Sequence, residues 1–109
     1  MKIYMGVWNI QQAKVLPQFM YSVRRLKDRI SAMPFNGLDW ILDSGGFSEI
    51  NINGKYSFSV EEYLHIVELH QPSLFFNMDY VCEKNALLKT GLSIKEHQEK
   101  TTTNHIKIT

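Results

Sequence analysis

The sequence of 109 residues has a single cysteine, a formal net charge of only +1 and no long apolar run. One cysteine excludes an internal disulfide and is typical of a protein in the reducing cytoplasm. The balanced charge excludes a chain-wide basic surface for nucleic acid. No apolar run approaches the roughly 20 residues that cross a bilayer, and the N-terminus has no signal-peptide pattern. We therefore expect a cytoplasmic protein with no membrane segment.

The residues that are present are typical of a globular protein, with 44% hydrophobic and 12% aromatic content. A chain of this length holds at most one modest domain. We therefore expect residues 1–109 to form one domain.

The N-terminal third carries the weakest pattern. Residues 2–7 suit a first strand, and residues 8–12 suit the loop that leaves it. Pro17 interrupts a helical pattern that begins near Gln12. Residues 19–23 fit either a short strand or the start of a helix.

Positive charge is concentrated in one place, at Arg24, Arg25, Lys27 and Arg29. An exposed helix face is the favoured interpretation of such a cluster. The functional alternative is a contact with nucleic acid, for which Arg24 and Arg25 are the candidates.

An apolar run that ends in a carboxylate is the most informative segment. Residues 38–42 are too few for a free-standing helix and glycines follow closely, so we expect a buried strand that stops at Asp43. Gly45 and Gly46 can adopt positive φ and expose backbone N–H groups to a ligand. The alternative is an Asx-type turn, in which Asp43 and Ser44 bond their own backbone.

A similar arrangement recurs further along the chain. Residues 73–78 are a second short apolar run, and Asp79 follows them. Between the two runs, Ser59 and Glu62 form a capping box, which predicts a helix that continues to about Leu69. Strand, loop, helix and strand in this order are a βαβ unit, whose strands are parallel.

Parallel strands bring their carboxyl ends to one edge of a sheet, where α/β proteins bind ligands. We therefore expect Asp43 and Asp79 to lie at the same edge, where they can share one substrate. This recurrence favours a ligand site over a simple turn. Cys82 is by default a small buried thiol, but it follows Asp79 by three residues and is a candidate to lie beside the site.

A second capping box, Ser93 with Glu96, predicts a helix that continues to His105. This helix is unusually polar, and the consecutive threonines at 101–103 weaken it. His97 and His105 are too far apart for the chelate that zinc helices use, and we expect no metal site here. A solvated helix face is one interpretation of its polar side chains. Contacts with a part of the protein outside this sequence are the other.

Four segments carry a family resemblance. They are residues 22–26, 40–49, 79–83 and 90–98. The run from Asp43 to Phe47, Asp-Ser-Gly-Gly-Phe, resembles a segment of the tRNA-guanine transglycosylases. Taken together and in order, the four segments more closely resemble the DNA 7-deazapurine transglycosylases, the deoxyPurine in DNA protein A family of phages and bacterial modification islands. Ser48 replaces the Gln common in the tRNA enzymes, which favours the DNA branch.

The resemblance implies a TIM-type barrel that exchanges guanine in DNA for a 7-deazaguanine such as preQ0, through a covalent glycosyl-enzyme. By motif position, Asp43 is implied as the catalytic acid/base, and Asp79 as the acceptor for the purine N–H edge. The implied substrate-binding residues are Ser44, Gly45, Gly46, Phe47, Asp79 and Cys82. Phe47 would stack on the base, and a base in duplex DNA would have to be flipped out.

A complete TIM barrel takes about 250 residues, whereas this sequence ends at Thr109. The resemblance therefore implies an α/β fold that is the incomplete N-terminal portion of such a barrel, with three or so parallel strand units. The nucleophilic aspartate and the Cys/His zinc site of the family are expected beyond this end. We accordingly expect no cofactor within the chain and no turnover by the chain alone. A second polypeptide is one way to complete the barrel.

Two other functions stay open on the sequence alone. One is a tRNA-directed relative with the same chemistry. The other is a non-catalytic remnant, or a small α/β module that binds a purine or a partner chain.

Overall fold

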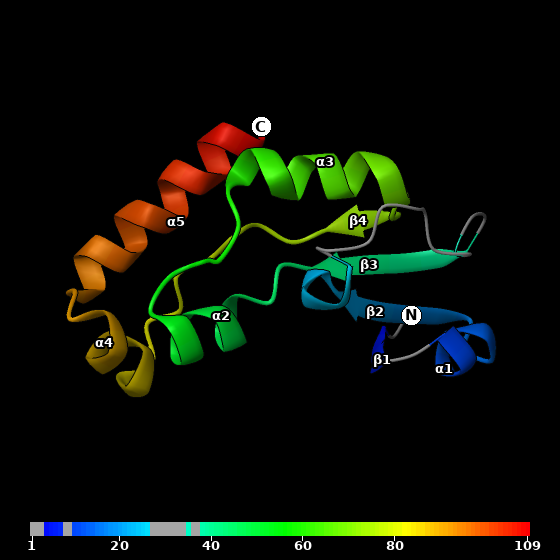
Figure 1. The fold of residues 1–109 in the computed structure, drawn as a ribbon, viewed down its shortest axis with the longest axis horizontal. Coiled ribbons are helices and arrows are strands. Elements are labelled where there is room, and N and C mark those ends of the chain that lie inside the picture. The colour runs from blue at the N-terminus through cyan, green and yellow to red at the C-terminus, as the bar shows by residue number, and fades with distance from the viewer. Residues whose placement is uncertain (1–3, 8–9, 27–34, 36–37) are drawn as a thin grey trace. The chain divides into compact units, whose positions relative to one another are not determined.

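The chain folds into two compact units (Figure 1). The structure, a computed structural model, describes residues 4–7, 10–26, 35 and 38–109. The sheet unit comprises Met1–Ser44 and Tyr63–Phe76, and the helical unit comprises Gly45–Glu62 and Asn77–Thr109. The expectation that residues 1–109 form one domain stays a prediction.

The sheet unit is built on four parallel strands, each beside the strand that follows it in the chain. They are β1 (Met5–Val7), β2 (Gln18–Ser22), β3 (Asp39–Asp43) and β4 (Leu74–Phe75). The predicted α/β class and the parallel pairing of the βαβ unit are confirmed. The register pairs Ser22 with Asp43, so the carboxyl ends of β2 and β3 are level.

The described residues of the N-terminal third form a short helix, two strands and a 3₁₀ turn. Helix α1 (Ile10–Lys14) occupies part of the segment predicted as a loop, and that part of the prediction is wrong. Residues 18–22 form β2, which decides between the two alternatives for this region. A 3₁₀ turn, η1 (Val23–Arg25), follows directly, because the Ser22 hydroxyl accepts a hydrogen bond from the Arg24 N–H at 3.2 Å. The basic residues at 27 and 29 lie outside the described residues.

The core of the sheet unit lies on one face of β2 and β3. Phe19 pairs in register with Trp40, and Tyr21 with Leu42, so all four side chains share a face. Phe19 stacks on Trp40 with 6.0 Å between ring centroids, and Phe35 packs edge-on against both. These five side chains are at most 5% exposed. Their burial stabilises β3 as the strand predicted to stop at Asp43.

Helix α3 (Val60–His70) begins at the predicted capping box. The Glu62 N–H donates to the Ser59 hydroxyl at 3.1 Å, and the Ser59 N–H donates to the Glu62 carboxylate at 3.0 Å. Further along, Tyr63 packs edge-on against Phe75 of β4, and its hydroxyl donates to the Phe76 carbonyl at 2.6 Å. The helix thereby covers β4 within the sheet unit.

Strand β4 is shorter than predicted. The apolar run at 73–78 pairs with β3 only through Leu74 and Phe75, although the Ser73 and Phe76 N–H groups also donate to β3 carbonyls. Leu74, Phe75 and Phe76 are 58%, 36% and 46% exposed, so these three apolar side chains lie at the surface. Asp79 therefore lies beyond an irregular segment and not at a strand end.

The helical unit contains α2 (Gly46–Asn53), α4 (Lys84–Thr90) and α5 (Ile94–Ile108). Helix α2 lies against α4 within this unit (Figure 1). Neither of these short helices was predicted from the sequence. Helix α5 begins at the predicted capping box of Ser93 and Glu96 and ends three residues beyond the prediction. Over the ranges that the structure describes, no helix is both long and apolar enough to cross a membrane.

A buried carboxylate ties α2 to the loop that follows it. The Glu49 side chain is fully buried and accepts hydrogen bonds from the Ser57 N–H at 2.9 Å and the Ser57 hydroxyl at 2.5 Å. The Asn53 amide, one helical turn on, donates to its other oxygen at 3.4 Å. Hydrogen bonds to a buried charge are stronger than neutral ones, so this cluster stabilises the start of the helical unit.

We expect Glu49→Ala to lower the free energy of unfolding by about 2–3 kcal/mol, because it removes the hydrogen bonds of a buried carboxylate. Urea denaturation measures the loss. The matched control is Glu99→Ala on an exposed face of α5, which should change stability by less than about 0.5 kcal/mol. Equal effects of the two substitutions would contradict this role of Glu49.

The Tyr80 phenol lies in a partly buried aromatic cluster of the helical unit. Its ring packs edge-on against Tyr56 and His97, each with 5.6 Å between centroids. The ammonium of Lys100 lies 5.4 Å from the ring centroid. Burial raises the pKa of Tyr80 above its usual 10.0, and a hydrogen bond from the Tyr56 backbone opposes this shift more weakly.

The raised pKa of Tyr80 predicts a loss of stability in alkali. A folded-state pKa above the unfolded value contributes stability that is complete below pH 10.0 and is lost as pH rises through the folded pKa. Absorbance of tyrosinate against pH should therefore show a late-titrating phenol, and Tyr80→Phe should remove it. An unchanged late phase in that variant would assign it to another tyrosine.

Candidate functional site

Asp43 lies at the carboxyl edge of the sheet unit. It is the last residue of β3, is partly exposed, and pairs in register with Ser22 of β2. The basic turn η1 leaves β2 at the same edge, with Arg25 exposed and Arg24 partly exposed. This edge therefore brings a carboxylate, a hydroxyl and the start of a basic turn together, as expected for the carboxyl ends of parallel strands. Ser44, the next residue, is buried.

The two glycines after Ser44 have different roles at the start of α2. Gly45 is the N-cap and has φ 69°, a left-handed conformation that favours glycine. Gly46 is already helical, so the prediction of a flexible glycine pair is wrong at this position. A Cβ at Gly46 would lie 2.9 Å from the Asp79 carbonyl oxygen and would clash with the Tyr56 hydroxyl. The absence of a side chain therefore lets α2 pack directly on the Asp79 loop.

Tyr56 is a residue of this site that the sequence analysis missed. Its hydroxyl donates to the Asp79 carbonyl oxygen at 2.7 Å. Gly46, Tyr56 and Asp79 are thereby brought together within the helical unit. The only sequence signal was an aromatic residue shortly before the capping box, which does not by itself indicate a partner.

Phe47 and Asp79, the two side chains predicted to contact the purine, are both exposed. The Phe47 ring is 61% exposed in the first turn of α2, which leaves its face accessible for stacking. Asp79 is exposed, and its Oδ1 accepts a hydrogen bond from the Asn77 amide at 2.7 Å. An ionised carboxylate accepts several hydrogen bonds, so Asp79 has further capacity for ring N–H donors.

The loop that carries Asp79, residues 77–82, is held by one face of α5. The Asn104 amide donates to the Met78 carbonyl at 2.8 Å, and the Tyr80 N–H donates to the Thr101 hydroxyl at 2.8 Å. His97 Nδ1 lies 2.8 Å from the Val81 carbonyl oxygen. These three side chains recur at spacings of four and three residues, the period of a single helix face. That spacing was the signal available in the sequence.

His97 is a structural residue rather than part of a solvated face. It is fully buried, and its Nε2 lies 2.7 Å from the Thr90 hydroxyl. A carbonyl only accepts, so Nδ1 carries the proton toward Val81. His105 is exposed, and no cluster of three metal-ligating side chains occurs among the residues that the structure describes.

Cys82 is exposed, so its default assignment as a buried thiol is wrong. Its Sγ lies 3.8 Å from the Tyr80 carbonyl oxygen and 4.0 Å from that of Ile94. The residue ends the Asp79 loop, two positions before α4 begins at Lys84. Cys82 is thus near Asp79 in the chain and accessible, but a substrate contact stays a prediction.

Asp43 belongs to the sheet unit and Asp79 to the helical unit. Their expected meeting at one edge is therefore not tested by the structure and stays a prediction. What the structure brings together is a smaller set, in which the α2 N-terminus, Tyr56 and α5 all contact the Asp79 loop.

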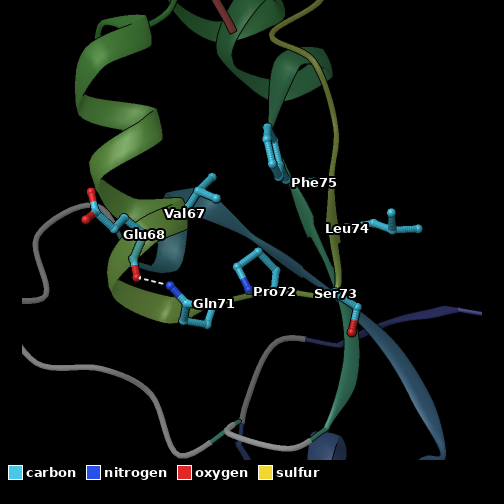
Figure 2. A pocket seen from close by; sticks show the side chains of 7 residues that line it. All are labelled: Val67, Glu68, Gln71, Pro72, Ser73, Leu74 and Phe75. Atoms are coloured by element: carbon cyan, nitrogen blue, oxygen red, sulfur yellow. Dashed lines mark hydrogen bonds between the residues drawn. The ribbon is translucent and has the colours of Figure 1, made fainter. Parts of the chain in front are cut away.

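The described residues line two surface hollows. One lies away from the Asp79 loop, and the other lies beside it. Figure 2 shows the first, a hollow of about 240 Å³ where α3 turns into β4; Phe75 points toward the helix side and Leu74 away from it. It lies at the amino end of β4, opposite to the edge at which parallel sheets bind ligands. The second, of about 410 Å³, runs along α5. Its lining combines Tyr80 with acidic and basic side chains of that helix, including Glu96 and Lys100.

Comparison with known proteins gives a family match. The family model for DeoxyPurine in DNA protein A matches residues 2–109. No curated protein and no solved structure matches the chain. Because the match spans nearly the entire sequence, the chain belongs to the DpdA family, DeoxyPurine in DNA protein A.

Proposed function

We propose that this chain takes part in DNA modification as a component of a base-exchange enzyme, in which guanine in DNA is replaced by a 7-deazaguanine base such as preQ0. The family name supports a role with deoxypurines in DNA. The structural observation that carries the proposal is the Asp79 carboxylate, which is exposed, oriented by Asn77 and mounted on a loop held by α5.

Asp79 is the group that recognises the purine. A guanine-like ring presents adjacent N–H donors on one edge, and a carboxylate accepts two such hydrogen bonds side by side. Phe47, exposed at the start of α2, supplies a ring for stacking. Gly46 has no Cβ, so the backbone of α2 can approach the same loop closely. A base in duplex DNA reaches these groups only after it is flipped out of the stack.

Asp43 acts as the acid/base carboxylate. General acid/base catalysis needs a carboxyl group near the leaving and entering purines, and the carboxyl end of β3 is a common place for it. Ser44 and Cys82 complete the set of proposed substrate contacts, and Arg24 and Arg25 are the proposed phosphate contacts.

The fold proposed for the whole enzyme is a TIM-type barrel. Support comes from the four parallel strands, each beside the next in the chain, which is the order in which such a barrel is built. The chemistry also needs a nucleophilic carboxylate and, in this family, a zinc site. The described residues do not fit the metal, because they contain no cluster of three ligands. We propose that both come from a segment beyond these 109 residues or from a second polypeptide.

We expect Asp79→Asn to weaken binding of preQ0 or guanine about 10- to 100-fold, because it replaces a charged acceptor with an amide that also presents donors. Isothermal titration calorimetry of the chain with each base measures the change. The matched control is Glu83→Gln, an exposed acid that follows the same loop, which should leave the affinity within about twofold. Equal affinities of the wild type and Asp79→Asn would contradict purine recognition by this carboxylate.

We expect no base exchange by the 109-residue chain alone, because the proposed nucleophile is supplied from elsewhere. The measurement is the transfer of labelled guanine or preQ0 into duplex DNA. Label that stays with DNA after incubation with the isolated chain would contradict the proposal that the nucleophile lies outside these 109 residues. If the completed enzyme labelled tRNA and not DNA, the substrate assignment would move to RNA.

A further inference from the structure

The Asp79 loop has irregular backbone, and side chains satisfy its polar groups in place of a sheet or helix ladder. Three partners come from one face of α5: Asn104 for the Met78 carbonyl, Thr101 for the Tyr80 N–H and His97 for the Val81 carbonyl. A fourth, Tyr56, donates to the Asp79 carbonyl. Because backbone groups need partners, these contacts determine the path of the loop.

Asn77 links this face of α5 to the Asp79 carboxylate itself. Its amide donates to the Thr101 carbonyl at 3.1 Å and to Asp79 Oδ1 at 2.7 Å. A carbonyl and a carboxylate both only accept, so the orientation of the Asn77 amide is determined by its partners. One oxygen of Asp79 is thereby tied to α5 through a single side chain.

We propose that α5 is the positioning element for Asp79, with Thr101 and Asn77 as its positioning residues. Thr101 accepts from the backbone N–H directly after Asp79, and Asn77 holds one of the two carboxylate oxygens. Together they orient an exposed carboxylate whose side chain would otherwise rotate. Ligand binding then loses less side-chain conformational entropy. The functional part of this proposal rests on the proposed purine recognition by Asp79; the positioning part does not.

The proposal also explains the composition of α5. Thr101 is β-branched and weakens the helix, yet its hydroxyl is the partner of the loop. His97, on the same face, is fully buried, whereas the neighbouring Thr102 and Thr103 are exposed. The polar residues on one face of this helix therefore contact the Asp79 loop, whereas Thr102 and Thr103 lie at the surface.

Thr101→Val tests the backbone contact, since it removes the hydroxyl and keeps the shape and the β-branching. Thr102→Val is the matched control, one position away and exposed. We expect hydrogen exchange of the Tyr80 amide to rise about tenfold in Thr101→Val and to stay unchanged in Thr102→Val, with equal helix content by circular dichroism. Equal exchange rates in both variants would overturn the positioning role of Thr101.

Asn77→Leu tests the contact with the carboxylate. NMR couplings of Asp79 should report one side-chain rotamer in the wild type and averaging in this variant, while Tyr80 amide protection stays within about threefold. If the wild type binds preQ0, the variant should bind it about three- to tenfold more weakly. The same rotamer averaging in both proteins would overturn the proposal. Rotamer ordering without any purine binding would support positioning and contradict the proposed function instead.

Discussion

The rest of this structure depends on one constraint: backbone N–H and C=O groups need hydrogen-bond partners wherever the chain leaves a helix or a strand. The ladder between β3 and β4 ends when the Phe76 N–H reaches the Leu42 carbonyl and the Phe76 carbonyl accepts from the Tyr63 hydroxyl. Beyond that residue, the backbone takes its partners from side chains, chiefly those of α5. These side-chain contacts satisfy backbone groups where the chain leaves the sheet, and the loop that results carries the exposed carboxylate of Asp79.

The two units are stabilised in different ways. In the sheet unit, Phe19, Trp40 and Phe35 form a buried aromatic cluster on one face of the strands, and apolar burial dominates. In the helical unit, Glu49 and His97 are fully buried polar side chains with hydrogen-bond partners. A core of that kind favours one arrangement of its side chains, because each buried polar group requires a hydrogen-bond partner in a defined place. Such a core is suited to holding the Asp79 loop in one conformation.

Membership of the DpdA family and the geometry around Asp79 are two different kinds of information about this chain. The family match concerns the order of residues along the chain. The geometry concerns what holds one of those residues, and it introduces Tyr56, Asn77 and Thr101, which the motifs did not single out as site residues. A site described by motif residues alone would therefore omit the side chains that determine where the motif carboxylate points.

The sequence by itself determined the features that depend on neighbouring residues. Both capping boxes follow from local patterns, because their donors and acceptors lie within three residues of each other. The strand that stops at Asp43 follows from a short apolar run with glycines close behind it. Tertiary structure alone decided that β4 stops at Phe75, that α2 begins at Gly46 and that His97 is buried. Each of these depends on a partner at least seven positions away, such as Tyr63 for Phe76, Asp79 for Gly46 and Thr90 for His97. Local propensity carries no information about such partners, since only the folded chain brings them into contact.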